Sequence, residues 1–285
     1  MAEGVERPLL IVDGDNLAHR AYHSMPKSLR SPDGRPINAI IGWTNMLVTL
    51  WESEQPRSIF VAWDTLGVET YRHKLWPTYQ AGRVFDEAIV TQLDLLPSLA
   101  TAFGFGVGKG AGYEADDFMA AAAHAETRRG GRSLLLTTDR DAYQLVSDSV
   151  TVLAPRSGVR DLVRIGPHQV VERLGVLPEQ VPDFKALAGD SSDNIPGARG
   201  IGPKAAAALL LKYGTLEAAI EARPDTISPS LGQQLLTFKH IVSMQADVEV
   251  ELPRSAPPDW VAAARRLDEL GAHNLASRLA ARARP

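Results

Sequence analysis

Nine acidic residues stand where an α/β fold would bring carboxylates together. Three short apolar runs that resemble buried strands each end in an aspartate, namely Asp13, Asp64 and Asp139. The carboxyl ends of parallel strands lie along one edge of a sheet, where the functional groups of such folds collect. An acid that ends one strand is usually a helix cap or a loop residue. Three at one edge repel each other unless cations neutralise them, so the pattern predicts a cation site.

Further acids lie in three motifs that could join this cluster. GYEADD opens an expected helix, the sequence DRD places Asp139 and Asp141 on one side of an extended segment, and GDSSDN holds two acids at helical spacing. Acids at a helix start also suit the helix dipole, but three in four positions exceed what capping requires. The full candidate metal set is Asp13, Asp64, Glu114, Asp116, Asp117, Asp139, Asp141, Asp190 and Asp193.

The chemistry of this set favours hard cations. The chain has no cysteine and the motifs carry no adjacent histidine ligand, so every donor would be an oxygen. Such a site suits Mg²⁺ or Mn²⁺ better than zinc or copper. A cluster of this size is typical of two-metal phosphodiester chemistry.

A glycine-rich segment, PGARGIGPK at residues 196–204, stands between two helical patterns. Glycines permit a tight turn with exposed amides, and free N–H groups at the start of the following helix can bind phosphate. The segment predicts a helix–hairpin–helix that binds the DNA backbone without sequence preference, the alternative being a simple turn. Its candidate DNA contacts are Gly197, Gly200, Gly202 and Lys204. By contrast, GVGKG at 106–110 lacks the Ser/Thr of a phosphate loop and is expected to be a flexible loop.

The elements around these motifs alternate between strands and helices. Strands are expected at 9–13, 58–64 and 133–139, with weaker candidates at 150–153 and 162–165; helices are expected at 37–53, 87–102 and 116–129. This order predicts an α/β fold with a mostly parallel central sheet flanked by helices. After about residue 175 only short helical patterns follow, at 179–188, 203–213, 216–222, 230–243 and 260–282. The expected domains are residues 1–175, 176–252 and 253–285.

The composition is that of a globular protein. Of the 285 residues, 45% are hydrophobic and 22% charged, enough to bury a large core. No apolar run approaches the ~20 residues of a membrane helix, and the first eight residues do not form a signal peptide. The absence of cysteine excludes disulfide scaffolds and cysteine catalysis, so we expect a cytoplasmic protein. The net charge of −4 argues mildly against a nucleic-acid partner, unless many of the acids bind metal.

The order of the motifs resembles the 5′ nuclease superfamily. The matching segments run through IVDGDNLAHRAYH, VAWD, TYQAGR, GYEADD, TTDRDAYQL, LAGDSSDNIPG and RGIGPKAA and cover essentially residues 9–280. The superfamily contains flap endonucleases and the 5′–3′ exonuclease domain of bacterial DNA polymerase I. The resemblance implies a PIN/Rossmann-like fold with a helical arch at about 76–110. Because no polymerase domain follows residue 285, we expect a stand-alone bacterial flap endonuclease.

The resemblance also implies residue roles. The first metal would lie among Asp13, Asp64, Glu114 and Asp116, and the second among Asp116, Asp139, Asp141 and Asp193, with Asp117 and Asp190 in an outer position. Arg20 and Arg83 match positions that approach the scissile phosphate. Tyr79 and Gln80, in the arch, match DNA-contacting positions. The backbone carbonyls of Ala198 and Ile201 would hold K⁺ at the hairpin.

One position departs from the family. The motif usually carries lysine where this chain has Gln80, and an amide cannot supply the charge that lysine would bring to the phosphate. Arg83, Arg72 or Lys74 would then compensate, or the enzyme would be slower. Trp76 and Tyr79 could equally stack on bases or pack in the core. Asp15 is interpreted as a loop acid and His19 as structural.

The leading hypothesis is a structure-specific 5′ nuclease, a flap endonuclease and 5′–3′ exonuclease that leaves a 5′-phosphate and a 3′-hydroxyl in DNA replication and repair. Its substrates would be 5′ flaps, nicked or gapped duplexes and RNA–DNA hybrids, and we expect a monomer. The alternatives are a non-catalytic DNA-binding protein and an RNA-directed nuclease of the same class. Only Gln80 supports the non-catalytic alternative.

Overall fold

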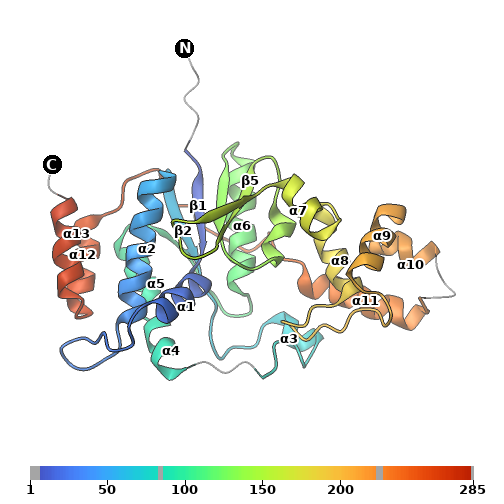
Figure 1. Ribbon diagram of the computed structural model, residues 1–285, viewed down its shortest axis with the longest axis horizontal. Helices are drawn as coiled ribbons and strands as arrows, with labels where there is room; N and C mark the ends of the chain where they lie inside the picture. The colour runs from blue at the N-terminus through green and yellow to red at the C-terminus, as the bar shows by residue number, and fades with distance from the viewer. Residues whose placement is uncertain (1–6, 83–85, 223–226, 284–285) are drawn as a thin grey trace, which may run out of the picture.

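A six-stranded sheet forms the centre of the molecule (Figure 1). The computed structural model describes residues 7–82, 86–222 and 227–283. The sheet has the order β3-β2-β1-β4-β5-β6, and all neighbouring strands are parallel except β5 and β6. The predicted α/β fold is therefore confirmed. The strands are β1 (Leu9–Asp13), β2 (Ser58–Ala62), β3 (Gly106–Gly108), β4 (Ser133–Leu136), β5 (Val150–Pro155) and β6 (Leu162–Ile165).

The sheet is buried on both faces. Alternate side chains of a strand point to opposite faces, so Leu9 and Ile11 enter one core while Leu10 and Val12 enter the other. All four are fully buried. This explains why β1 has a continuous apolar sequence rather than an alternating one.

The first face carries the helices that pack with Leu10 and Val12. The last two helices return from the far end of the chain to this face, where α12 packs against α5. The helices of this layer are α1 (Gly14–Ser24), α2 (Asn38–Glu54), α4 (Glu87–Leu93), α5 (Leu96–Ala102), α12 (Trp260–Glu269) and α13 (His273–Arg282).

The second face is covered by α6 (Ala115–Arg128), and its core continues into a helical region at the opposite end of the molecule from α12 and α13 (Figure 1). The α8–α9 connection contains both the GDSSDN motif and the glycine hairpin, so the fold links the hairpin to the sheet edge. The remaining elements are α3 (Tyr71–Leu75), η1 (Asp141–Leu145), α7 (Pro167–Leu174), η2 (Pro178–Gln180), α8 (Val181–Ala188), α9 (Pro203–Tyr213), α10 (Leu216–Ala222) and α11 (Pro229–Val242).

Two segments differ from the sequence-based expectations, and a third, expected at 260–282 as one helical segment or a pair, is a pair. The GVGKG segment is not a loop throughout, because Gly106–Gly108 pairs with β2 as the edge strand β3. A Cβ on Gly106 would lie 2.8 Å from Phe60 and from Pro253, so glycine is required by close packing rather than by flexibility. The helix expected at 87–102 is divided before Pro97, which cannot donate a backbone hydrogen bond. The last helical segment is a pair that turns at Gly271, with φ +81°.

The predicted arch at 76–110 contains α4, α5 and β3, and all three of these elements pack against the body of the molecule. No helix within the described ranges combines the length and apolar character needed to cross a membrane.

Candidate metal centre

A cavity of about 160 Å³ opens at the carboxyl ends of β1, β2 and β4. It lies at the switch point of the sheet, where the strand order reverses around β1. Among the described residues that line it, none is a lysine or an arginine. Eight carboxylates do line it: Asp13, Asp15, Asp64, Glu114, Asp116, Asp139, Asp141 and Asp193.

The ends of β1 and β4 are joined by hydrogen bonds that orient their acids. Asp13 caps α1 by accepting from Asn16 N at 2.9 Å, and its second oxygen accepts from the Thr137 hydroxyl at 2.8 Å. The Thr137 hydroxyl also accepts from Asp139 N at 3.0 Å, and Asp139 in turn accepts from Asp141 N at 2.9 Å. The residues that follow β4 therefore orient two carboxylates: the Thr137 hydroxyl orients that of Asp13, and the Asp141 N–H orients that of Asp139.

The start of α6 is held against the end of β2. Asp64 accepts from Ala115 N at 2.7 Å, which fixes the first turn of α6 beside the cavity. Glu114, at the N-cap position of α6, accepts from the hydroxyls of Tyr79 at 3.0 Å and Thr70 at 3.2 Å. These contacts bring Glu114 and Asp116 to the same cavity, as the sequence predicted.

Proton affinities at the site are raised because the acids are buried and face each other. Burial, reinforced by Asp64 and Asp139, raises the pKa of Asp13 to about 7. Burial likewise raises the pKa of Glu114 to about 7, with Asp64 adding to the effect and Arg72 opposing it. Burial also raises the pKa values of Asp15 and Asp116 well above their usual range, and neighbouring carboxylates add to both shifts.

These properties fit divalent cations. All the acidic donors are oxygens, they come from separate elements around one small cavity, and no lysine or arginine stands among the described lining residues. A hard divalent cation takes such ligands and would remove the repulsion that raises the pKa values.

A second acidic group adjoins the cavity on the side of the α8–α9 loop. Carboxylate oxygens of Asp141, Asp190 and Asp193 lie within 4.8 Å of one another. Here a cation is already present, because the Lys185 ammonium lies 2.5 Å from Asp190 and also contacts Asp141. Burial alone would raise the pKa of Asp190, but Lys185 and Ser192 hold that pKa below its usual value. Asp190 therefore adjoins the cavity without lining it.

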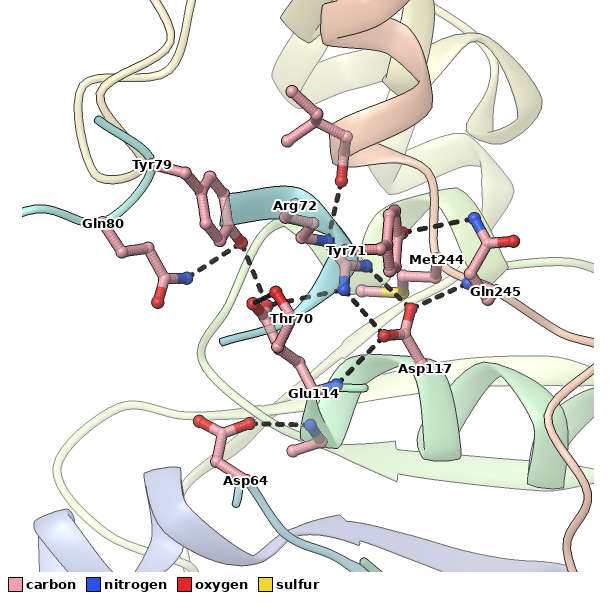
Figure 2. A network of polar contacts seen from close by, with 12 residues as sticks. Asp64, Thr70, Tyr71, Arg72, Tyr79, Gln80, Glu114, Asp117, Met244 and Gln245 are labelled. Carbon is pink, nitrogen blue, oxygen red and sulfur yellow. Dashed lines mark hydrogen bonds and ion pairs between the residues drawn. The ribbon is translucent and has the colours of Figure 1, made fainter. Parts of the chain in front are cut away.

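Asp117, like Asp190, is a predicted metal ligand that does not line the cavity, and it is paired with an arginine (Figure 2). It is fully buried, and its two oxygens each lie 2.7 Å from the Arg72 guanidinium. The same oxygens also accept from the backbone N–H groups of Glu114 and Gln245. With its acceptor positions used in this way, Asp117 stabilises the start of α6 and is not available to a metal.

The predicted cationic residues are not gathered around the cavity. Arg72 is buried in its pair with Asp117 and donates to Ile241 O at 2.8 Å, so it cannot replace the missing lysine. Lys74 is exposed and lines a different cavity, beside Tyr71 and His240. Arg20 donates to Pro155 O at 2.8 Å, at the end of β5. Arg83 lies outside the described residues.

Tyr79 and Gln80 lie at the cavity, but their side chains face inward. Tyr79 is only 4% exposed and bonds Glu114, so packing rather than base stacking accounts for its ring. Gln80 donates to the Tyr79 hydroxyl at 2.9 Å and to Asp193 at 3.1 Å. Trp76 likewise packs edge-on against Phe238.

The hairpin has the form that the sequence predicted. Gly202 caps α9, which begins at Pro203, and a Cβ on Gly200 or Gly202 would meet no atom within 4 Å. Lys204 is exposed. At the inner end, Gly197 has φ +68° and its Cβ would lie 2.4 Å from Gly189 N, so glycine is needed for the turn itself. Ala198 O accepts from Ile201 N at 2.9 Å, which closes the hairpin.

Two charged residues of this region were missed by sequence reasoning. Asp15 is not an ordinary loop acid, because it lines the cavity and accepts from Asp64 N at 2.8 Å. Its position two residues after Asp13 was a usable signal. Lys185 had no such signal, because only the folding of α8 against η1 brings it to Asp141. His19 also lines the cavity.

The fold and this cavity define a resolvase-like α/β domain with a carboxylate-rich site that could hold cations. Comparison with known families agrees: residues 8–175 match the 5'-3' exonuclease N-terminal resolvase-like domain, and residues 176–258 match the 5'-3' exonuclease C-terminal SAM fold. The chain belongs to the 5'-3' exonuclease family, as its motifs predicted.

Two relatives and two solved structures illustrate the similarity. The chain is 40% identical over 229 residues to DNA polymerase I of Mycobacterium bovis, and 36% identical over 280 residues to that of Deinococcus radiodurans. These matches cover 80% and 94% of this chain but only 25% and 28% of the relatives, so the chain spans about a quarter of their length.

Among solved structures, the zinc-bound T5 5'-exonuclease has a TM-score of 0.67 at 22% identity, covering 96% of this chain and 97% of the other. A complex of a variant of the bacteriophage T5 flap endonuclease with DNA and metal ions has a TM-score of 0.68 at 23% identity, covering 96% and 98%. At this level of identity the likeness supports the fold.

Proposed function

We propose that this protein is a metal-dependent, structure-specific 5′ nuclease, acting as a flap endonuclease and 5′–3′ exonuclease on DNA. The observation that carries the proposal is the cavity lined by eight carboxylates with no lysine or arginine among its described lining residues. Two or more Mg²⁺ or Mn²⁺ ions are the cofactors that this donor set favours. Bound there, such ions would activate water and stabilise charge on the scissile phosphate.

The family resemblance supports an assignment of the cavity acids to two metal ions. Asp13, Asp64, Glu114 and Asp116 would hold the first ion, and Asp116, Asp139, Asp141 and Asp193 the second. Thr137 orients the Asp13 carboxylate and accepts from the backbone N–H of Asp139, while the backbone N–H of Asp141 orients the Asp139 carboxylate. Lys185 would hold Asp141 and Asp190 in place and reduce their repulsion toward an approaching phosphate. Hydrolysis would leave a 5′-phosphate and a 3′-hydroxyl.

The hairpin would hold the duplex beside this site. Gly200, Gly202 and Lys204 leave the backbone and the ammonium open to a phosphate chain. The carbonyls of Ala198 and Ile201 would contribute to a K⁺ site in the same turn. In this proposal residues 1–175 would form the cleavage domain and residues 176–252 the duplex-binding domain. Residues 253–285 would cover the face of the sheet opposite α6.

The substrates would be 5′ flaps, nicked or gapped duplexes and RNA–DNA hybrids formed in replication and repair, and the protein would act as a cytoplasmic monomer. A 5′-labelled flap, incubated with Mg²⁺, with Mn²⁺ or with EDTA, tests the activity. Cleavage at the flap base with either ion and none with EDTA is expected. Binding without cleavage under all three conditions would instead support a non-catalytic DNA-binding protein, and cleavage of a matched RNA flap alone would support the RNA-directed nuclease.

A further inference from the structure

Two segments far apart in the sequence are fastened together beside the cavity. Trp76 Nε1 donates to Asn194 O at 3.0 Å, and Gln80 N donates to Asp193 O at 3.3 Å. In the other direction, the Asn194 side-chain amide donates to Thr78 O at 3.0 Å and to Ala81 O at 3.1 Å. Residues 76–81 are thus bound to residues 193–194 by several hydrogen bonds.

The hydrogen bonds between residues 76–81 and residues 193–194 hold two residues in an unfavourable backbone conformation. Gln80 has φ +51° and Asn194 φ +58°, and they are two of the three non-glycine residues with positive φ in the described ranges. Such a conformation is unfavourable for a residue with a Cβ and persists only where the surroundings fix it. The two strained residues therefore indicate that the position of Gln80 is specified by the fold.

The Gln80 side chain links Asp193 to Glu114 through hydrogen bonds. A primary amide has two N–H groups, and those of Gln80 reach the Tyr79 hydroxyl at 2.9 Å and Asp193 at 3.1 Å. The Tyr79 hydroxyl has one proton, which it donates to Glu114 at 3.0 Å; Figure 2 shows the bonds from Gln80 to Tyr79 and from Tyr79 to Glu114. Gln80 therefore donates toward both carboxylates, directly to Asp193 and through the Tyr79 hydroxyl to Glu114.

We propose that Gln80 is a positioning residue that sets Asp193 relative to Glu114, and therefore sets the geometry of two ligands that reach the metal cavity from different elements. The inference rests on the proposed function. In this role a neutral amide has an advantage over lysine, because it orients the Asp193 carboxylate without placing a positive charge where a divalent cation must bind. Gln80 is then not a weaker substitute for a phosphate-binding lysine.

Three variants of the full chain test this role. Gln80→Met keeps the length of the side chain but removes both donors, and Gln80→Lys keeps donors but adds a charge. The matched control is Gln55→Met, because Gln55 is also a glutamine at positive φ (+46°) but is exposed at the end of α2, next to the amino end of β2. The readout is Mn²⁺ affinity measured by electron paramagnetic resonance without DNA, followed by single-turnover flap cleavage over a range of Mn²⁺ concentrations.

We expect Gln80→Met to weaken Mn²⁺ binding by about 10- to 100-fold, the usual effect of removing a residue that orients a metal ligand. Excess Mn²⁺ should restore much of the cleavage rate, and flap affinity should stay unchanged. Gln80→Lys should also weaken Mn²⁺ binding, while Gln55→Met should match the unmodified protein. Unchanged Mn²⁺ affinity in Gln80→Met, or faster cleavage by Gln80→Lys at unchanged Mn²⁺ affinity, would overturn the proposal and make Gln80 a phosphate contact.

A folding defect is separated from a loss of positioning by a second variant. If Gln80→Met lowers the unfolding temperature, Tyr79→Phe replaces it, because that change removes only the hydroxyl that links Gln80 to Glu114. It should weaken Mn²⁺ binding in the same way, and normal binding would contradict the proposal. If the unmodified protein binds Mn²⁺ but cleaves no flap, the proposed function fails, yet the ratio of Mn²⁺ affinities still decides the role of Gln80.

Discussion

Asp116 and Asp117 are neighbours in the first turn of α6, yet they occupy opposite electrostatic environments. Asp117 is fully buried with both oxygens 2.7 Å from the Arg72 guanidinium. Asp116 faces the cavity, where burial and then the Asp139 and Asp13 carboxylates raise its pKa. Asp117 is fully buried and Asp116 is half-buried. The more informative difference between the two acids is the charge of the groups that surround each of them.

A second buried arginine–carboxylate pair shows the same contrast with the acids of the cavity. Arg57 and Glu126 form another buried pair, with contacts at 2.5 and 2.9 Å, on the second face of the sheet. Pairs of this kind hold elements together, because removing one partner leaves an uncompensated buried charge. The cavity instead gathers acids whose pKa values are raised by burial and by their neighbouring carboxylates.

The largest effect is expected for Asp116→Ala. Loss of this ligand should reduce flap cleavage by about 10³-fold or more, since each ligand positions a cation that stabilises transition-state charge. DNA binding should survive or improve, because a negative charge beside the phosphate is removed. Single-turnover cleavage and a binding titration measure the two effects. Near-normal turnover in Asp116→Ala would contradict the metal assignment.

Asp117, which is paired with Arg72, should affect stability rather than metal binding. Asp117→Ala leaves Arg72 buried without its main partner, so the free energy of unfolding should fall by about 3–5 kcal/mol. Urea unfolding without metal measures it, with Asp116→Ala as the control that should not lose stability and should gain some. Equal stabilities for the two variants would remove the distinction between the acids.

The cavity should make the metal-free protein less stable as the pH rises. Asp13 and Glu114 have folded-state pKa values of about 7, above the values near 4 of unfolded carboxyls. Between these values the folded state binds more protons than the unfolded state, so the free energy of unfolding decreases as pH increases from about 4 to about 7. In EDTA the melting temperature should drop by roughly 5 °C from about pH 5 to about pH 7.5, and Mn²⁺ should recover it.

The control for this titration is Asp13→Asn, which removes one of the four cavity carboxyls whose pKa is raised. Its melting temperature should fall less over the same pH range. A melting temperature in EDTA that rises with pH in the unmodified protein would show that the cavity acids are not destabilised by burial and mutual repulsion.

The smallest effect concerns the hairpin. Lys204→Ala should weaken binding to all duplex sequences alike, and the slope of log affinity against log salt should decrease by about one unit. The metal cavity should be unaffected, so Mn²⁺ affinity without DNA serves as the internal control. An unchanged salt dependence would exclude Lys204 from the phosphate contacts.

The sequence predicted the parallel sheet and most of the cavity because strand ends and acid spacing are local patterns. It also anticipated α9 and α10 with the observed boundaries, where glycine and proline mark the ends. Residue spacing alone could not separate Asp116 from Asp117, which only the family resemblance assigned to different positions, because the difference depends on Arg72, which is brought to α6 by the packing of α3 against α11. Lys185 was missed for the same reason. The residues that pair with a buried charge are often distant in the sequence, so the local sequence around the charge does not predict them.

The central claim is that the clustered acids of the cavity, and not the arginine-paired Asp117, hold divalent cations. Anomalous diffraction from crystals of the protein soaked in Mn²⁺ tests it directly. We predict manganese density between Asp13, Asp116 and Asp139, with the Arg72–Asp117 pair intact and free of metal. Absence of manganese among these three carboxylates at saturating Mn²⁺, or manganese bound by Asp117, would contradict the account.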